Sequence, residues 1–419
     1  MYAVIMAGGK GTRIASVRSD VPKPMIPVCG KPILEHQIEV LRRQGVTDII
    51  LVIGHLGKVI RQYFGSGETY GVAIRYVEEA QPLGTAGALY ELKDFLTQDF
   101  LFLNGDLIFD VDLEKMAAYH KRKGGIATIL THPNNHPYDS GLIECNEQGQ
   151  VQKWLTREEK RLYYRNRVNA GIHMLSPKVF WYVKELKKMD LDRDILKKLI
   201  PLRQLYAYAS PEYVMDMGTP ERYEQVEKDL RNGKVRMKNL QQKQRAVFLD
   251  RDGTLNIQKG FIKRAEEVVL CPGAAKAVRL INDSGYLAIM ISNQPVIARG
   301  EATFAEVERM MDKIETLLGE GGAYLDDRFY CPHHPDSGFD GEITELKIRC
   351  SCRKPEPGLL YKAAEKYHID LKNSYMVGDS MADVIAGRRA GCSSFLLDDQ
   401  KGNAYDYKNL LACVQGIFC

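Results

Sequence analysis

Strand-like and helix-like segments alternate along this chain, and the alternation runs through twice. In the first run, apolar stretches predict strands and apolar residues at helical spacing predict a helix: Tyr2–Met6 (strand), Pro32–Gln44 (helix), Asp48–Ile53 (strand) and Phe100–Leu103 (strand). A polar, basic stretch follows at residues 231–245, after which Ala246–Leu249, Ala274–Asn282 and Tyr286–Ile291 again predict strand, helix and strand. This pattern predicts parallel sheets flanked by helices. We therefore expect two Rossmann-like α/β domains, residues 1–232 and 245–419, joined by a linker at 233–244.

Composition excludes several classes of protein. A chain of 419 residues with 45% hydrophobic and 27% charged residues is typical of a soluble globular protein with two cores. The net charge of +4 is too small for a protein that coats nucleic acid. No apolar run approaches the roughly 20 residues of a membrane helix, and the N-terminus lacks the pattern of a signal peptide. We expect a cytoplasmic protein with no nucleic-acid or membrane partner; a homo-oligomer is left open.

The first strand runs into a glycine-rich turn, Met6-Ala7-Gly8-Gly9-Lys10-Gly11-Thr12-Arg13. Glycines allow backbone N–H groups to approach phosphates closely, and an arginine adds charge-assisted hydrogen bonds. Lys23 follows between two prolines, which hold it in an extended segment where it can point at an anion. The small-residue turn Pro82–Gly87 is able to pack against a flat base or ribose.

Two aspartates in the first half are candidate metal ligands. Asp106 ends a buried strand, where open α/β sheets bind ligands, and Asp216 lies in a Met-Asp-Met-Gly-Thr-Pro segment. Paired carboxylates can hold Mg²⁺, which prefers oxygen ligands and bridges phosphates.

In this order the motifs resemble the nucleoside-diphosphate-sugar pyrophosphorylase family, over roughly the first 230 residues. The resemblance implies Mg²⁺ at Asp106 and Asp216, and Arg13 and Lys23 as catalytic groups. It also implies a set of residues that bind nucleotide and sugar: Gly8, Gly9, Gly11, Thr12, Gly84, Gly87, Lys160, Asn169 and Gly171. The expected reaction is in-line attack of a sugar 1-phosphate oxygen on the α-phosphorus of a nucleoside triphosphate, with loss of pyrophosphate.

The second half begins with a sharper motif, in which an apolar strand delivers Asp250 and Asp252 into a glycine turn. Alternate strand residues point the same way, so both carboxylates are expected to face one substrate. One can attack phosphorus while the other protonates the leaving oxygen. Ser292 and Asn293 follow another apolar strand and can donate to the transferring phosphoryl group.

Further charged residues complete this second site. Arg353 and Lys354 supply positive charge, and Asp379 with Asp383 ends another strand. The set resembles the haloacid dehalogenase superfamily of phosphatases, from residue 245 onward. The resemblance implies Asp250 as the nucleophile that forms an aspartyl-phosphate, Asp252 as general acid and base, and Lys354 as the group that steadies both nucleophile and phosphate. It implies Mg²⁺ held by Asp250, the backbone carbonyl of Asp252, and Asp379, with Asp383 in support.

A metal loop is predicted between these motifs. Cys331 and His333 form one close pair and Cys350 and Cys352 another, as in closed tetrahedral zinc sites with three sulfurs and one nitrogen. His334 is a rival ligand, but the spacing favours His333. The remaining cysteines are expected to be reduced thiols.

The zinc loop narrows the resemblance to heptose bisphosphate phosphatases, although histidinol phosphatases carry a similar loop. Together the halves suggest a bifunctional enzyme of GDP-D-glycero-α-D-manno-heptose synthesis, which acts on sugar phosphates and a nucleoside triphosphate, with GTP expected. Three alternatives stay open: a mannose or other hexose 1-phosphate as the sugar, a histidinol phosphatase in the second half, or a first half that is a non-catalytic sugar-nucleotide sensor.

Overall fold

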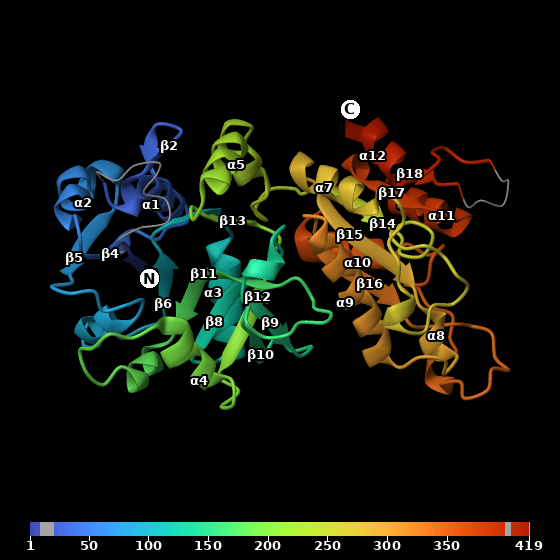
Figure 1. Cartoon of the computed structure of the whole chain (residues 1–419), viewed down its shortest axis with the longest axis horizontal. Coiled ribbons are helices and arrows are strands. Elements are labelled where there is room, and N and C mark those ends of the chain that lie inside the picture. Colours follow the sequence, from blue (N-terminus) through green and yellow to red (C-terminus); the bar gives the residue numbers. More distant parts are fainter. Residues whose placement is uncertain (9–20, 399–403, 419) are drawn as a thin grey trace. The chain divides into compact units, whose positions relative to one another are not determined.

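The computed structural model describes residues 1–8, 21–398 and 404–418. Contacts divide the chain into two compact units (Figure 1). Unit 1 comprises Met1–His132, Ile143–Trp154 and Asn169–Asn239, and unit 2 comprises Pro133–Leu142, Leu155–Val168 and Leu240–Cys419. The domain ranges expected from the sequence stay a prediction; the predicted linker contains a short helix, and the units divide between Asn239 and Leu240.

Unit 1 is built on a nine-stranded sheet with the main order β10-β9-β11-β6-β1-β4-β5, extended from β11 through β8 to β12. Its strands are β1 (Tyr2–Met6), β2 (Pro27–Val28), β3 (Lys31–Pro32), β4 (Asp48–Ile53), β5 (Ala73–Glu78), β6 (Phe100–Asn104), β7 (Leu107–Asp110), β8 (Ala127–His132), β9 (Leu142–Cys145), β10 (Val151–Leu155), β11 (Val168–Leu175), β12 (Leu205–Ala209) and β13 (Tyr213–Asp216). Its helices are α1 (Ile33–Arg43), α2 (Gly57–Phe64), α3 (Leu113–Lys123), α4 (Lys197–Leu199), α5 (Pro220–Arg231) and α6 (Lys234–Met237). The small sheets β13-β7 and β2-β3 stand apart from the large one.

The strand β1 shows why this sheet is covered on both faces. Ala3 and Ile5 belong to one buried cluster and Val4, between them, to another. Successive strand side chains point to opposite faces, so a run of apolar residues must bury both sides of the sheet.

The prediction of a parallel sheet holds for only part of unit 1. Strands β5, β4, β1 and β6 pair in parallel, but β11 pairs antiparallel with both β6 and β9. Strands β9, β10 and β11 follow one another without an intervening α-helix. A parallel neighbour requires a long crossover connection, whereas an antiparallel one does not. The sheet is therefore mixed, which is a correction to the expectation.

Unit 2 contains a five-stranded, wholly parallel sheet with the order β16-β15-β14-β17-β18. Its strands are β14 (Ala246–Leu249), β15 (Leu287–Asn293), β16 (Asp327–Cys331), β17 (Tyr375–Gly378) and β18 (Ser393–Leu396). Its helices are α7 (Ala274–Ser284), α8 (Pro295–Ala298), α9 (Phe304–Glu320), α10 (Gly358–Tyr367), α11 (Met381–Ala390) and α12 (Leu410–Phe418). The central strand β14 again alternates, with Val247 and Leu249 in one buried cluster and Ala246 and Phe248 in another.

Two segments from the first half of the chain pack within unit 2. On Leu155–Val168, Arg165 Nη2 lies 2.7 Å from Oδ1 of Asp327, and the Asn166 N–H donates to Glu315 Oε2 at 2.8 Å. Asp327 and Glu315 are both buried, so the carboxylate ends of these contacts are shielded from solvent.

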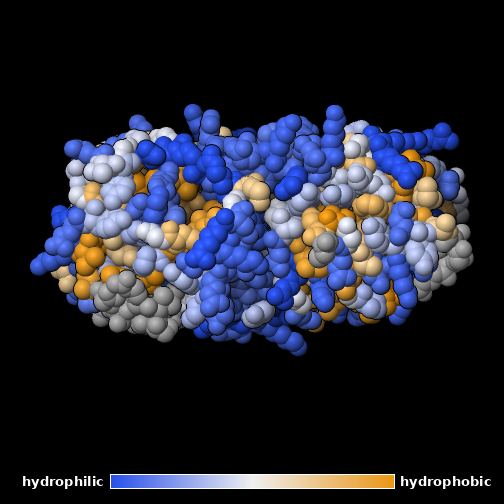
Figure 2. Space-filling view, turned by 90° about the horizontal axis from the view of Figure 1, so that it is seen from above, coloured by the Kyte–Doolittle hydropathy of each residue, from blue (hydrophilic) through white to orange (hydrophobic). Residues whose placement is uncertain are grey.

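The surface carries no extended apolar band on the face drawn in Figure 2, where hydrophilic residues cover much of the area and apolar residues form smaller groups. Among the described helices, none has the length and hydropathy needed to cross a membrane.

Candidate active sites

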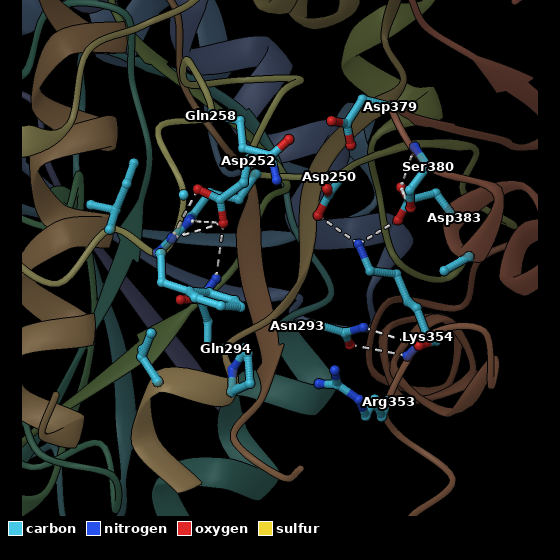
Figure 3. Close-up of a pocket in the computed structure, with 17 residues that line it drawn as sticks. Asp250, Asp252, Gln258, Asn293, Gln294, Arg353, Lys354, Asp379, Ser380 and Asp383 are labelled. Atoms are coloured by element: carbon cyan, nitrogen blue, oxygen red, sulfur yellow. Dashed lines mark hydrogen bonds and ion pairs between the residues drawn. The ribbon is translucent and has the colours of Figure 1, made fainter. Parts of the chain in front are cut away.

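The clearest site lies in unit 2, at the carboxyl end of the central strand. Asp250 follows β14, whose neighbours are β15 and β17, and ligands of open α/β sheets bind at this end of the strands. A pocket opens there (Figure 3). The residues that line it include Asp250, Asp252, Asn293, Arg353, Lys354, Asp379 and Asp383. The structure thus brings most of the expected phosphatase residues to one edge of the sheet.

Lys354 joins two of the carboxylates in this pocket. Its Nζ lies 2.5 Å from Oδ1 of Asp250 and 2.5 Å from Oδ1 of Asp383, and donates to the carbonyl of Ile291 at 2.9 Å. Asn293 holds the lysine backbone through two hydrogen bonds of 3.0 Å, donating to its carbonyl and accepting from its N–H. The ammonium group is therefore fixed beside Asp250.

Negative charge is crowded around Lys354. Burial, and then the charge of Asp383, raises the pKa of Asp250 to about 8. Burial and Asp383 likewise raise the pKa of Asp379 to about 6. Burial acts to lower the pKa of Lys354, but the carboxylates of Asp250 and Asp383 raise it on balance, so the lysine stays charged. One lysine does not balance these carboxylates, and a further cation would favour their ionised forms.

The carboxylates fit a divalent cation. One oxygen from each of Asp250, Asp379 and Asp383 lies within 4.8 Å of the others, and Mg²⁺ prefers such oxygen ligands. Gly253, with φ +79°, permits this arrangement, since a Cβ there would lie 2.0 Å from Oδ2 of Asp379. The expected magnesium ligands, including the Asp252 carbonyl, stay a prediction, and Asp383 joins the group.

Asp252 has other partners than Asp250, which pairs with Lys354. Its carboxylate accepts from Nε and Nη2 of Arg251, both at 2.9 Å, on the side of the pocket away from Lys354 (Figure 3). Both carboxylates line one pocket, but they have different partners, because β14 ends at Leu249 and strand alternation does not extend through the turn that follows.

The other expected phosphate-binding residues have distinct environments. Ser292 is buried, and its hydroxyl accepts from Gln294 Nε2 at 2.8 Å. Asn293 lines the pocket, but its side-chain amide is hydrogen-bonded to the backbone of Lys354. Arg353 also lines the pocket, and its Nη1 donates to the carbonyl of His333 at 3.1 Å. Arg353 is thus attached to the predicted metal loop twice, because its backbone follows Cys352 and its side chain binds the carbonyl of His333.

The four expected ligands of the metal loop lie close together, as a closed metal site requires. Each of Cys331, His333, Cys350 and Cys352 offers one ligand atom within 4.8 Å of the others, and the closest sulfur pairs are 3.2–3.5 Å apart. A zinc ion with Zn–S bonds of about 2.3 Å would separate tetrahedral sulfurs by roughly 3.8 Å, so small outward shifts suffice. Hydrogen bonding from Cys331 lowers the pKa of Cys352 to about 5, which favours the thiolate. His334 instead lies 3.2 Å from Nη2 of Arg299. The residues therefore fit zinc.

In unit 1, the two expected magnesium ligands lie on adjacent segments. Strand β13 pairs antiparallel with β7, which places Asp216 opposite Leu107, and the Met217 N–H donates to the carbonyl of Asp106 at 2.9 Å. Lys23 Nζ lies 2.5 Å from Oδ2 of Asp106. The Asp106 and Asp216 side chains are 32% and 40% exposed, so a cation can reach them, and Mg²⁺ binding by this pair stays a prediction.

The structure describes only some of the residues expected near the nucleotide. Gly9, Gly11, Thr12 and Arg13 lie outside the described residues. At Gly84 and Gly87 a Cβ would lie 2.3 Å from the carbonyl oxygens of Met189 and Lys187, so both allow close backbone packing. At Gly8 a Cβ would lie 2.9 Å from Oε2 of Glu79.

The expected sugar-binding residues belong to different units, with Asn169 and Gly171 in unit 1 and Lys160 in unit 2. Asn169 Oδ1 accepts from the Gly171 N–H at 3.2 Å, and Asn169 Nδ2 lies 3.5 Å from both carboxylate oxygens of Asp192. Burial raises the pKa of Asp192 to about 6. Lys160 is exposed and belongs to the segment Leu155–Val168 of unit 2.

Sequence reasoning missed several side chains at these sites. Arg222 Nη1 holds both oxygens of Asp216, at 2.7 and 2.8 Å. Thr219 and Pro220 form a helix-start signal that could have placed Arg222 in the first turn of a helix near Asp216. No local pattern pointed to Asp192 or to the partners of Asp252.

Comparisons with known proteins give separate family matches for the two halves of the chain. A family model described as nucleotidyl transferase matches residues 2–233, and one described as HAD-hydrolase-like matches residues 351–410. Mannose-1-phosphate guanylyltransferase 1 of Arabidopsis thaliana is 34% identical over 229 residues, covering 53% of this chain and 63% of that protein. Mannose-1-phosphate guanyltransferase beta-A of Xenopus laevis is 33% identical over 226 residues, covering 53% and 62%. The chain thus spans less than two thirds of the length of these relatives.

A solved structure supports the fold of unit 1. The "Putative Glucose-1-Phosphate Thymidylyltransferase" of Bacillus anthracis, crystallised with a sucrose, has a TM-score of 0.51 and 23% identity, covering 55% of this chain and 96% of that one. At this identity the likeness concerns the fold.

These matches confirm the prediction of two α/β parts, of which the first is nucleotidyltransferase-like and the second HAD-like. The prediction of an enzyme is also confirmed, because both family descriptions name enzyme classes. Because the first match spans more than half of its length, this chain belongs to the nucleotidyl transferase family.

Proposed function

We propose that this chain is a bifunctional enzyme that makes GDP-D-glycero-α-D-manno-heptose. Unit 2 would hydrolyse the 7-phosphate of heptose 1,7-bisphosphate, and unit 1 would transfer GMP from GTP to the resulting heptose 1-phosphate. The observation that carries the proposal is the occurrence in one chain of two aspartate–lysine pairs at strand ends, Asp250 with Lys354 and Asp106 with Lys23. The product of the first reaction is the substrate of the second.

The phosphatase reaction follows from the residues of the pocket. An oxygen of Asp250 attacks phosphorus, the bond to the C7 oxygen breaks, and Asp252 gives its proton to that oxygen. Asp252 then takes a proton from water, the water oxygen attacks phosphorus, and the Asp250–phosphorus bond breaks to release phosphate. Lys354 favours the ionised form of the nucleophile, as a cation held by the neighbouring carboxylates would, and stabilises charge on the phosphoryl oxygens.

The transferase reaction requires no side-chain nucleophile. A phosphate oxygen of the sugar 1-phosphate attacks the α-phosphorus in line, and the bond to pyrophosphate breaks. Charge moves between oxygens, so Lys23 contributes by positioning and by electrostatic stabilisation, as does Arg13 in the expected set.

Metal ions would support both reactions. Asp106 and Asp216 in unit 1, and Asp250 and Asp379 with the Asp252 carbonyl in unit 2, would hold Mg²⁺, which neutralises phosphate charge. The four ligands of the cysteine–histidine loop would hold zinc as a structural ion that fixes a loop with little core of its own.

Two lines of support favour guanosine and a manno sugar. The relatives of unit 1 are named as mannose-1-phosphate guanylyltransferases, and D-glycero-D-manno-heptose shares the ring configuration of mannose. The zinc-type loop and the motif at Asp250 resemble heptose bisphosphate phosphatases. Nucleotide and sugar-phosphate substrates, together with free cysteines, suit a cytoplasmic enzyme.

The test supplies heptose 1,7-bisphosphate, GTP and Mg²⁺ together and measures product mass. We expect GDP-heptose, inorganic phosphate and pyrophosphate from the wild type. Asp250→Asn should stop phosphate release, and Asp106→Asn should leave heptose 1-phosphate as the final product. Phosphate release by Asp250→Asn would refute the assigned nucleophile. Formation of GDP-heptose by Asp106→Asn would refute the role assigned to Asp106.

Mannose 1-phosphate is the second candidate sugar, since the curated relatives carry its name. If this chain used mannose 1-phosphate in preference to heptose 1-phosphate, the heptose assignment would be wrong. Turnover of histidinol phosphate by unit 2 would favour the histidinol alternative, and sugar-nucleotide binding without pyrophosphate release would favour the sensor.

A further inference from the structure

Asp252 lies at the centre of a hydrogen-bond network in the turn after β14. Its Oδ2 accepts from Arg251 Nε at 2.9 Å and from Gln294 Nε2 at 3.3 Å. Its Oδ1 accepts from Arg251 Nη2 at 2.9 Å and from Asn256 Nδ2 at 3.0 Å. Three side chains therefore define the plane of this carboxylate, and Arg251 contributes two of the four bonds.

The guanidinium group of Arg251 is buried within the turn that follows β14. Arg251 and Asp252 both line the pocket, but the Arg251 side chain is only 2% exposed, whereas that of Asp252 is 22% exposed. The Arg251 carbonyl accepts from the N–H groups of Leu255 and Asn256, both at 2.9 Å. The arginine is thus fixed at its backbone and at its tip.

Stability alone does not account for this arginine. Within the described part of the chain, Nη1 of Arg251 is buried and has no hydrogen-bond partner. A buried charged donor without a partner costs about 1–3 kcal/mol or more, and a buried ion pair is weak evidence for a stabilising role. A packed apolar side chain would fill the same space without that cost.

We propose that Arg251 is a positioning residue for Asp252. This inference rests on the proposed phosphatase chemistry of unit 2. The two parallel N–H groups of the guanidinium fix the direction of the carboxylate, as bidentate arginine–carboxylate pairs do. Arg251 thereby acts through Asp252, by setting where the proton is delivered to the leaving oxygen.

A series of substituted phenyl phosphates separates this role from a structural one. General acid catalysis contributes roughly 10²–10⁴-fold when the leaving oxygen needs a proton. The 4-nitrophenolate ion leaves with little need of one, whereas phenolate needs it more. We expect Arg251→Met to lower kcat/KM about 100-fold for phenyl phosphate and less than about 10-fold for 4-nitrophenyl phosphate, with KM little changed for either. Arg251→Lys keeps the charge but loses the planar pair of donors, so it should remain impaired on phenyl phosphate.

Arg328 offers a matched control in the same unit. It is also buried, and it pairs with Glu308, Asp312 and Glu315. Arg328→Met should lower thermal stability, while the folded enzyme that remains should hydrolyse both phenyl phosphate and 4-nitrophenyl phosphate at the wild-type rate. Equal losses on the two phosphates in Arg251→Met, no loss on either, or full recovery in Arg251→Lys would overturn the inference.

The phenyl series also keeps this inference distinct from the sugar assignment. A wild type that hydrolyses phenyl phosphates but not heptose 1,7-bisphosphate refutes the proposed sugar, and the Arg251 comparison still decides the positioning role. A wild type that hydrolyses none of these phosphates refutes the phosphatase function and this inference with it.

Discussion

Replacing Gly253 by alanine tests the acidic site of unit 2 directly. At φ +79° an L-residue costs about 1–2 kcal/mol. The added Cβ would also lie 2.0 Å from Oδ2 and 2.4 Å from Cγ of Asp379, while real Cβ contacts stay above 3.0 Å. The carboxylate must therefore move by about 1 Å. Since a misplacement of that size costs roughly 100-fold in rate, we expect kcat for phosphate release to fall by at least that factor.

Gly322→Ala is the matched control for backbone strain. Gly322 has φ +69°, and no heavy atom lies within 4 Å of a Cβ built there. Both variants should therefore lose about 1–2 kcal/mol of unfolding free energy, measured by chemical denaturation. Only Gly253→Ala should lose phosphatase activity and require more Mg²⁺ for half-maximal rate. Phosphate release by Gly253→Ala within threefold of that by Gly322→Ala would refute the reasoning.

Three further predictions concern other parts of the chain. Burial lowers the pKa of His173 to about 3, against about 6.5 when unfolded, so stability is fully present above pH 6.5 and falls as the pH drops toward 3. The loss at pH 5 relative to pH 7 is about 2 kcal/mol, and His173→Leu should remove that difference from denaturation curves; an unchanged difference would contradict it. Lys23→Met should lower kcat/KM for pyrophosphate release at least about 10-fold and leave phosphate release intact, and equal effects on both reactions would argue against a local role. Cys352→Ser should lower the bound zinc per chain and raise KM for the phosphatase substrate through Arg353, and full zinc content would argue against the assigned ligand.

The strands that carry the sites were predictable because buried parallel strands are continuous apolar runs. Asp48–Ile53 and Ala246–Leu249 have the predicted bounds, and the predicted helix at Pro32–Gln44 runs from Ile33 to Arg43. Because ligands gather at the carboxyl ends of such strands, the acidic residues that follow them were also found.

Features that depend on distant partners were not predictable in the same way. The antiparallel placement of β11 depends on which strand it meets, and no local pattern specifies that partner. The direction of Asp252 depends on where β14 ends and on Gln294, which arrives from the next strand. Asp192 lies on a π-helix, Leu191–Leu196, and meets Asn169 only in the folded unit.

The two aspartate–lysine pairs share a distance but differ in solvent exposure, and that difference matches their proposed chemistry. Both pairs have a nitrogen–oxygen separation of 2.5 Å, yet the Asp106 side chain is 32% exposed and that of Asp250 only 12%. A carboxylate that only binds a metal benefits from solvent access, because the ion and its waters must enter. A nucleophilic carboxylate is more reactive when water is excluded, provided that a fixed cation keeps it ionised. Burial, rather than the ion pair itself, therefore distinguishes the proposed covalent site of unit 2 from the proposed metal-dependent transfer site of unit 1.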